Sequence, residues 1–403
     1  MKNLFCWLAI ALLFVGCKSK KPELRLGNYQ LNFIFNNHEG EYNLPIDFKL
    51  FTKNDQLYGE FKSSNEIIQT TNIQQNKDSI YFKMPVFQSE FKLGFTKQGL
   101  AGVFTRTDRE TSREFKVVAF HNKPRFSSKP STINLSGRYK VNFKYPDGSG
   151  YPAIGELQQV KDKITGSFIT ETGDYRYLEG VVNGDSLKLT GFDGAHVFLF
   201  LAKANSDSIT GLFKASISHK EFFTATLNDT FQLRDGDSLT FLKPGYSSVN
   251  FKLPNINGDT ISSEDERYQE KPLIIQITGS WCPNCMDETR FLAEMYNKYN
   301  AEGLEVVALS FERFKTFEEN AAAVFKIKQD LNVPYTSLIA GLKNKETINR
   351  VLPMLNHVMS YPTAIFIDKN GKILKIQTGF SGPGTSVYND YVINTEKLIQ
   401  SML

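Results

Sequence analysis

The sequence predicts a multidomain protein in which an all-β N-terminal region, made of two tandem antiparallel β modules, precedes an α/β domain. The chain has 403 residues, enough for two or three domains. Apolar and polar residues alternate with a period of two from about Leu26 to Asp229, which is typical of half-buried strands. After about Thr230 the pattern changes to short apolar runs followed by helical stripes, which predicts strand–helix units.

The composition excludes several classes of protein. Hydrophobic residues make up 41% and charged residues 22% of the chain, so a collagen-like, disordered or polytopic membrane protein is excluded. The net charge is +4, and acidic and basic residues are interleaved, so we expect no nucleic-acid partner. Only four cysteines are present, too few for a disulfide scaffold.

Residues 1–16 have the pattern of a signal peptide, with Lys2 before an apolar run from Leu4 to Val15. The next segment, Phe14-Val15-Gly16-Cys17, resembles a bacterial lipobox. The resemblance implies that Cys17 is lipidated and that residues 17–25 form a polar tether. We therefore expect a lipid-anchored protein of the bacterial cell envelope, facing the periplasm or the cell surface. An ordinary signal peptide or a short anchor remains the alternative.

The β region repeats itself, which predicts β module 1 at residues 26–122 and β module 2 at residues 133–230. Each copy has roughly eight short strands, suited to two small antiparallel barrels or sandwiches or to one larger closed meander. The Pro- and Ser-rich segment from His121 to Thr132 is the expected junction. Four segments match in order between the copies: Tyr29–Phe33 with Tyr139–Phe143, Gly59–Phe61 with Gly166–Phe168, Asp78–Ile80 with Asp185–Leu187, and Leu100–Phe104 with Ile209–Phe213.

The β region shows no pattern of catalytic residues. Its histidines, His38, His121, His196 and His219, are scattered and do not have metal-ligand spacing. We expect a docking or spacing role for the two modules. Binding of a ligand in a barrel mouth remains an alternative.

Residues 231–248 are the predicted linker, and residues 249–403 the α/β domain. The domain should open with an entry strand at Val249–Pro254 and a turn at Asn257–Asp259. A closing helix is expected at Tyr391–Met402. The other predicted strands are Leu273–Thr278, Leu304–Phe311, Tyr335–Ile339, Ala364–Asp368 and Ile373–Thr378, with a helix on each side of Tyr335–Ile339.

The motif Trp281-Cys282-Pro283-Asn284-Cys285 lies between the strand Leu273–Thr278 and a predicted helix. This places Cys282 at the helix N-terminus, where free N–H groups and the helix dipole stabilise a thiolate. Pro283 suits the first turn, and Cys285 lies one turn further on, so the two cysteines can form a disulfide. A zinc site needs more ligands than this pair supplies, and no second pair of cysteines follows it. A purely structural disulfide is the other alternative.

From about Val249 to Leu403 the chain resembles the TlpA/ResA-like membrane-attached thiol-disulfide oxidoreductases of the thioredoxin superfamily. The resemblance implies a thioredoxin-like domain in which Cys282 attacks and Cys285 resolves the mixed disulfide. It also implies that Glu288 assists proton transfer and that Pro362 is a cis-proline facing the cysteines. Trp281, Tyr361 and Thr363 would surround the bound partner.

The sequence thus predicts an extracytoplasmic, lipid-anchored thiol-disulfide oxidoreductase that reduces disulfides in partner proteins. It has no nicotinamide motif and no second CxxC, so we expect no cofactor or metal and an unidentified thiol electron donor. Pro283-Asn284 between the cysteines leaves a disulfide-forming oxidant as an alternative, and a surface β-module binding protein is another. A peroxiredoxin is disfavoured because Gly279 stands where peroxide chemistry needs a hydroxyl residue.

Overall fold

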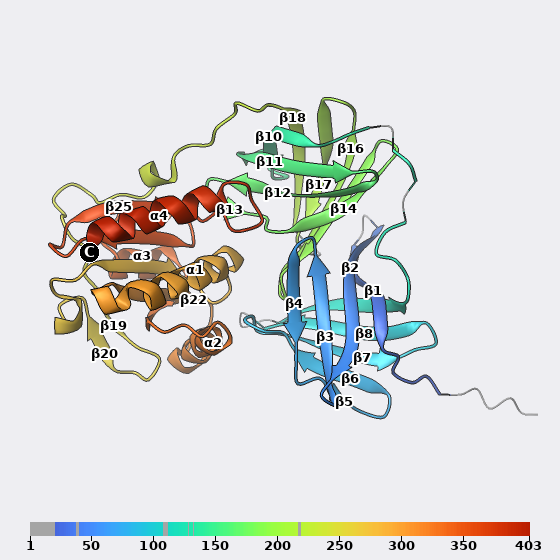
Figure 1. Ribbon diagram of the computed structural model, residues 1–403, viewed down its shortest axis with the longest axis horizontal. Helices are drawn as coiled ribbons and strands as arrows, with labels where there is room; N and C mark the ends of the chain where they lie inside the picture. Colours follow the sequence, from blue (N-terminus) through green and yellow to red (C-terminus); the bar gives the residue numbers. More distant parts are fainter. Residues whose placement is uncertain (1–20, 38–39, 108–111, 128, 132, 217–218) are drawn as a thin grey trace, which may run out of the picture.

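The computed structural model describes residues 21–37, 40–107, 112–127, 129–131, 133–216 and 219–403 (Figure 1). The predicted signal peptide and the lipidation site at Cys17 lie outside these residues. Among the described residues, no helix combines the length and the apolar character needed to cross a membrane.

The first β module is one antiparallel sheet with the strand order β4-β3-β2-β1-β9-β8-β7-β6-β5. Alternate side chains of these strands turn inward, and the interior is rich in phenylalanine, including Phe33, Phe61, Phe91 and Phe104. The strands are β1 (Gly27–Asn37), β2 (Gly40–Lys53), β3 (Gln56–Ser63), β4 (Glu66–Thr70), β5 (Gln74–Gln75), β6 (Ser79–Lys83), β7 (Ser89–Phe95), β8 (Gly99–Arg106) and β9 (Arg113–His121).

The second β module is also a nine-stranded antiparallel sheet, with the order β11-β10-β18-β17-β16-β15-β14-β12-β13. Because β12 pairs with β11 as well as with β14, eight of its strands close into a barrel. The strands are β10 (Gly137–Lys144), β11 (Gly150–Val160), β12 (Lys163–Thr170), β13 (Gly173–Asp174), β14 (Leu178–Asn183), β15 (Ser186–Phe192), β16 (Val197–Ala204), β17 (Ser208–Lys214) and β18 (Lys220–Leu227).

The predicted fold of the β region is confirmed as two tandem antiparallel modules. The four matched segments fall on β1 and β10, β3 and β12, β6 and β15, and β8 and β17, so equivalent strands are always nine apart. Each module has nine strands rather than about eight. The single large meander is excluded, because the strands form two separate sheets.

The two β modules share part of their interior. Phe192, at the end of β15 in the second module, lies among the rings of the first module, 5.1 Å from Phe33 and 5.2 Å from Phe61 between ring centroids. Arg125, in the segment between the modules, is buried and donates to the carbonyl oxygens of Pro45 and Thr190. These contacts fix the modules against each other.

The α/β domain has a five-stranded mixed sheet of order β23-β22-β21-β24-β25, in which β21, β22 and β23 are parallel. The central strand β21 is buried along its whole length, as expected for a strand covered on both faces. The strands are β21 (Leu273–Thr278), β22 (Glu305–Glu312), β23 (Thr336–Leu342), β24 (Thr363–Ile367) and β25 (Ile373–Thr378), preceded by the hairpin β19 (Lys252–Pro254) and β20 (Thr260–Ser262).

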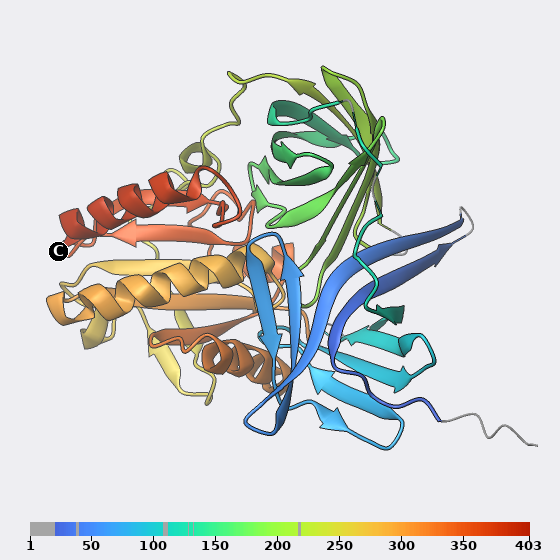
Figure 2. The ribbon, with the colours of Figure 1, turned by 45° about the vertical axis from the view of Figure 1, so that its right-hand side comes forward.

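Two helices, α1 and α4, pack side by side on one face of this sheet (Figures 1 and 2). The helix α3 and the segment around Val249 and Phe251 cover the other face. The helices are α1 (Pro283–Tyr299), α2 (Phe317–Asp330), α3 (Lys345–Val351) and α4 (Tyr388–Met402), with short 3-10 turns at Gly236–Ser238, Glu266–Tyr268 and Asn300–Glu302.

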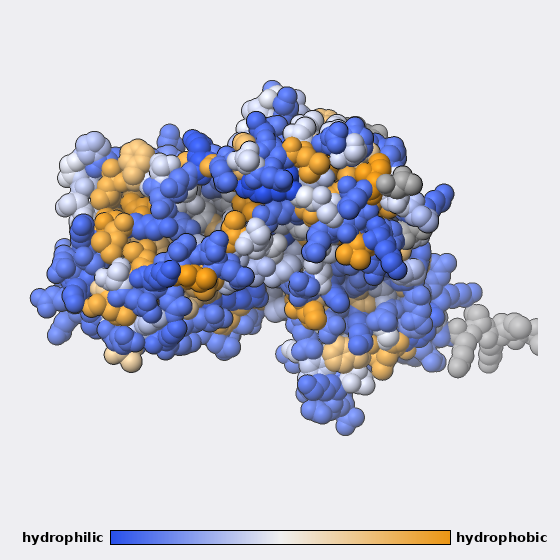
Figure 3. Space-filling model, turned by 45° about the horizontal axis from the view of Figure 1, so that its top comes forward, coloured by the Kyte–Doolittle hydropathy of each residue, from blue (hydrophilic) through white to orange (hydrophobic). Residues whose placement is uncertain are grey.

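The N-terminal end of α1 points toward the two β modules (Figures 1 and 2). A small apolar cluster joins all three parts of the molecule there, formed by Val86, Phe87, Ala195 and Met286. On the face shown in Figure 3, apolar residues form separate patches within a mostly hydrophilic surface.

Candidate active site

The two cysteines lie at the point where β21 passes into α1. Cys282 is the N-cap residue of the helix, and its Sγ accepts a hydrogen bond from the backbone N–H of Cys285 at 3.2 Å. Pro283 occupies the first turn, where no N–H donor is needed. Gly279 is required in the preceding turn, because a Cβ there would lie 2.4 Å from Nε1 of Trp281. The local fold therefore holds one sulfur at the positive end of a helix.

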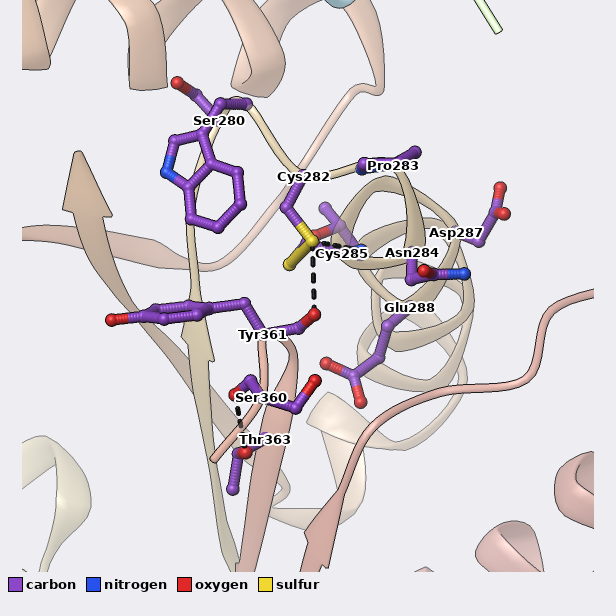
Figure 4. The surroundings of a disulfide bond; sticks show 12 residues. Ser280, Cys282, Pro283, Asn284, Cys285, Asp287, Glu288, Ser360, Tyr361 and Thr363 are labelled. Carbon is purple, nitrogen blue, oxygen red and sulfur yellow. Dashed lines mark hydrogen bonds between the residues drawn. A yellow bond between two sulfur atoms is a disulfide. The ribbon is translucent and has the colours of Figure 1, made fainter. Parts of the chain in front are cut away.

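Cys282 and Cys285 are joined by a disulfide bond (Figure 4). Cys282 is 4% exposed and Cys285 is 1% exposed, so an incoming partner sulfur meets Cys282 first. The Sγ of Cys282 lies 3.3 Å from the carbonyl oxygen of Tyr361, to which a reduced thiol could donate. The Tyr361–Pro362 peptide bond is cis, as the resemblance implied.

The side chains around the disulfide are held by hydrogen bonds from neighbouring loops. The Nε1 of Trp281 donates to the carbonyl oxygen of Phe311 at 2.9 Å, and its ring meets Tyr361 edge to face at 5.3 Å. Thr363 is fully buried, and its hydroxyl donates to the carbonyl oxygen of Ser360 at 2.9 Å. Thr363 therefore supports the loop from behind rather than lining its surface.

A buried glutamate lies one turn beyond Cys285 on α1. Glu288 is fully buried, and its Oε2 accepts a hydrogen bond from Nε2 of Gln276 at 2.9 Å. Its Oε1 has no hydrogen-bond partner among the described residues. Burial raises the pKa of Glu288 to about 8, so the carboxyl group carries a proton at neutral pH.

Three charged groups at the site were not anticipated from the sequence. The backbone N–H and the hydroxyl of Ser280 donate to the carboxylate of Glu312, at 2.8 and 2.5 Å. The Lys343 ammonium lies 3.7 Å from the ring centroid of Trp281, and the Arg313 guanidinium 4.0 Å from it. Arg313 directly follows β22, and Lys343 directly follows β23. This position at the ends of two strands was the only signal in the sequence that could have placed them near the cysteines.

The second β module also reaches the site. The Nδ2 of Asn284 donates to the backbone oxygen of Asp174 at 3.3 Å, and the hydroxyl of Ser360 donates to the backbone oxygen of Thr172 at 2.7 Å. Arg176 is buried and pairs with Asp287 on α1. No local pattern in the sequence links residues 172–176 to the cysteines.

Comparison with known proteins identifies the family. A family model described as the AhpC/TSA family matches residues 244–376. The thiol-disulfide oxidoreductase ResA of Bacillus thuringiensis is 30% identical over 134 residues, which cover 32% of this chain and 67% of that protein. ResA of Geobacillus thermodenitrificans is 30% identical over 142 residues, covering 35% of this chain and 72% of that protein.

The chain belongs to the ResA-like thiol-disulfide oxidoreductases of the thioredoxin superfamily. The solved thioredoxin domain of a thiol-disulfide oxidoreductase from Bacteroides vulgatus is similar at 19% identity and a TM-score of 0.31, over 40% of this chain and 99% of that one. The matched residues carry the CxxC motif, and the β modules lie outside them. As a ResA-like oxidoreductase, the protein exchanges a dithiol for a disulfide.

Proposed function

We propose that this protein is an extracytoplasmic, lipid-anchored reductase of protein disulfides. The observation that carries the proposal is the position of Cys282, whose sulfur caps α1 and accepts the N–H of Cys285. That position favours the negatively charged form of the sulfur, which is the nucleophile in disulfide exchange.

The reaction needs only the two cysteines and the partner. The Cys282 thiolate attacks one sulfur of the partner disulfide, and a new S–S bond forms as the partner bond breaks. The other partner sulfur leaves as a thiolate and takes up a proton. The Cys285 thiolate then attacks Sγ of Cys282, closes the Cys282–Cys285 disulfide and releases the second partner thiolate. The partner gains two electrons, so a thiol donor protein must reduce the pair again.

Glu288 is the proposed proton carrier for Cys285. It lies on the same helix one turn away, and its carboxyl group is protonated at neutral pH because burial raises its pKa to about 8. A carboxyl group with a pKa near the working pH can both give and take a proton. Trp281, Tyr361 and Pro362 form the proposed contact surface for the partner chain, and Thr363 positions the loop that carries Tyr361 and Pro362.

The anchor is proposed from the sequence alone. Lipidation of Cys17 would hold the protein on a membrane, and residues 17–25 would keep the β modules away from its surface. We expect the wild-type protein to incorporate labelled fatty acid and the Cys17→Ser variant to incorporate none. Equal labelling of both proteins would contradict lipidation at Cys17.

The reduction potential of the Cys282–Cys285 pair tests the redox proposal. The full chain is equilibrated in redox buffers, with the double variant Cys282→Ser, Cys285→Ser as the control without a pair. A potential near that of thioredoxin, about −270 mV, or lower supports a reductase. A potential near about −120 mV would instead indicate a disulfide-forming oxidant. Absence of a reversible disulfide would overturn the redox proposal and favour a binding role for the β modules.

A further inference from the structure

A cleft of about 850 Å³ opens beside Cys282. Its floor is formed by the dithiol turn and by the loop that ends in Tyr361. The start of α3 and the preceding residues form one part of its wall, and Thr172 of the second β module forms another. A partner disulfide has to enter this cleft to reach the 4% of Cys282 that is exposed.

The lining of the cleft is positively charged. It includes Lys243, Lys343 and Lys345, and of the described residues that line it none is aspartate or glutamate. The turn at residues 171–174 holds two carboxylates: Glu171 is paired with Arg234, and Asp174 is buried and accepts the N–H of Gly382. The residues that line the cleft therefore carry a net positive charge, which attracts acidic groups.

The β-module wall is fixed in place by contacts on three sides. The backbone oxygen of Thr172 accepts the hydroxyl of Ser360 at 2.7 Å, and the backbone oxygen of Asp174 accepts Nδ2 of Asn284 at 3.3 Å. The turn also packs closely: a Cβ on Gly379 would lie 2.9 Å from the carbonyl carbon of Thr172. The wall is thus attached to the loop and the helix that carry the chemistry.

We propose that this cleft selects an acidic, extended segment of the partner protein that carries the disulfide, held between the turn at residues 171–174 and the lysines at the start of α3. The proposal rests on the proposed disulfide reductase activity and names its substrate class. The lysines attract the acidic segment and speed its encounter with Cys282. The turn at residues 171–174 makes the second β module part of the substrate site.

Two synthetic peptides test this with the full-chain protein, reduced by dithiothreitol and then freed of it. Each peptide holds one intramolecular disulfide, flanked by glutamates in one peptide and by lysines in the other. Hydroxyethyl disulfide, which is small and neutral, is the third substrate. At low salt we expect the acidic peptide to react at least about tenfold faster than the basic one. At about 1 M salt, where the Debye length is about 3 Å, the ratio should approach one.

Point variants locate the effect. Lys345→Gln and Lys243→Gln should each slow the acidic peptide about two- to fivefold, the range expected for one exposed charge pair. Neither should change the rate with hydroxyethyl disulfide. Lys397→Gln, on the exposed side of α4, is the matched control and should change neither rate. Thr172→Glu adds a negative charge to the exposed wall and should slow the acidic peptide while speeding the basic one.

The outcomes separate this inference from the proposed activity. Equal rates for the two peptides, with normal reduction of hydroxyethyl disulfide, would overturn the inference and leave the reductase standing. Slowing of all three substrates alike by Lys345→Gln would also overturn it, because a structural defect does not depend on substrate charge. Failure to reduce hydroxyethyl disulfide at all would overturn the proposed activity itself.

Discussion

The two β modules follow the same order of strands but use one hairpin differently. In the first module, β4 pairs with β3 from Gly59 to Ser63, so β4 and β5 become the two edges of an open sheet. In the second module the equivalent strand β13 has only two residues, which leaves Lys163–Gly166 of β12 to pair with β14. The shorter hairpin therefore allows the barrel to close.

This difference gives the modules different neighbours. The open first module takes Phe192 of the second module into its interior. In the closed second module, Tyr175 packs against the barrel core, and its neighbours between Glu171 and Arg176 contact the dithiol helix and the loop around Ser360. Of two modules with equivalent strand order, one is thus completed by its neighbour and the other borders the active site.

Phe192→Ala should have the largest effect, because it removes a ring that lies among Phe33, Phe61, Phe91 and Phe104. We expect the free energy of unfolding to fall by about 3–5 kcal/mol, the usual cost of deleting a buried phenylalanine. Urea unfolding measures the loss, and limited proteolysis measures the separation of the modules.

Phe200→Ala is the control for Phe192→Ala, because Phe200 is fully buried in the core of the second barrel itself. It should cost a similar free energy without exposing the first module to protease. Equal exposure of the first module in both variants would contradict the idea that Phe192 completes its core.

Arg176→Met tests the attachment of the second module to the redox domain. Arg176 pairs with Asp287 on α1 and with Glu66 on β4. Loss of one partner of a buried ion pair costs about 3–5 kcal/mol, and we expect the low end because Asp287 keeps Arg290 at 3.2 Å. Urea unfolding with fluorescence detection measures the change.

The exposed pair of Arg234 with Glu171 gives the matched control for Arg176→Met. Arg234→Met should cost no more than about 1 kcal/mol. A similar cost for both variants would mean that Arg176 does not hold the domains together.

Local sequence patterns predicted the secondary structure near the cysteines well. The strands Leu273–Thr278 and Ile373–Thr378 have the predicted bounds, because apolar β-branched runs and a turn signal such as Asn370-Gly371 define a strand without help from the rest of the fold. The spacing of Cys282 and Cys285 allowed a disulfide, and the structure contains it.

Contacts between domains could not be predicted in this way. Thr172 and Arg176 lie more than a hundred residues before the cysteines, and neither belongs to a motif. Their contacts with the redox domain depend on the length of β13. This strand is three residues shorter than its equivalent β4, which leaves β12 free to pair with β14. Sequence patterns indicate where the strands lie. They do not indicate small differences in strand length, and these differences decide which strand edge stays unpaired.

The pKa values of two buried acidic side chains, one in the second module and one in the redox domain, shift in opposite directions. In the second module burial opposes ionisation of Asp193, but His196 and Arg176 outweigh it and lower the pKa of Asp193 to about 2. In the redox domain burial raises the pKa of Glu288 to about 8. The stabilisation from Asp193 is therefore present above pH 4 and is lost as the pH falls toward 2, whereas the stabilisation from Glu288 is lost as the pH rises from the ordinary glutamate pKa to about 8.

Glu288→Gln should remove the fall in stability between the ordinary glutamate pKa and about 8. Between the ordinary glutamate pKa and about 8, Glu288 is protonated in the folded wild-type protein and ionised in the unfolded chain. Unfolding therefore releases a proton, and the free energy of unfolding falls by up to about 1.4 kcal/mol per pH unit in this range. The variant should lose this slope, and Asp193→Asn should change only the acidic side of the curve. Urea unfolding at several pH values measures both, and an unchanged slope in Glu288→Gln would contradict the raised pKa.

Gly173→Ala should give the smallest effect and addresses the short hairpin directly. Gly173 has a φ of 146°, and a Cβ there would lie 2.6 Å from Oδ1 of Asn284, between the two cysteines. Gly184 also has a positive φ, 59°, but a Cβ there would meet no atom within 4 Å, so Gly184→Ala is the matched control. From the backbone alone, Gly184→Ala should lose about 1 kcal/mol of stability and Gly173→Ala at least as much.

Only Gly173→Ala should also slow the reduction of a peptide disulfide, by up to about fivefold. The new Cβ displaces Asn284, and we expect this displacement to raise the activation free energy by about 1 kcal/mol. Stopped-flow kinetics with a peptide disulfide measures this rate in both variants. A rate equal to that of Gly184→Ala would show that the second barrel borders the cleft without influencing it. A selective loss would show that closing the barrel also shaped the substrate site, since the same shortening of β13 produced both.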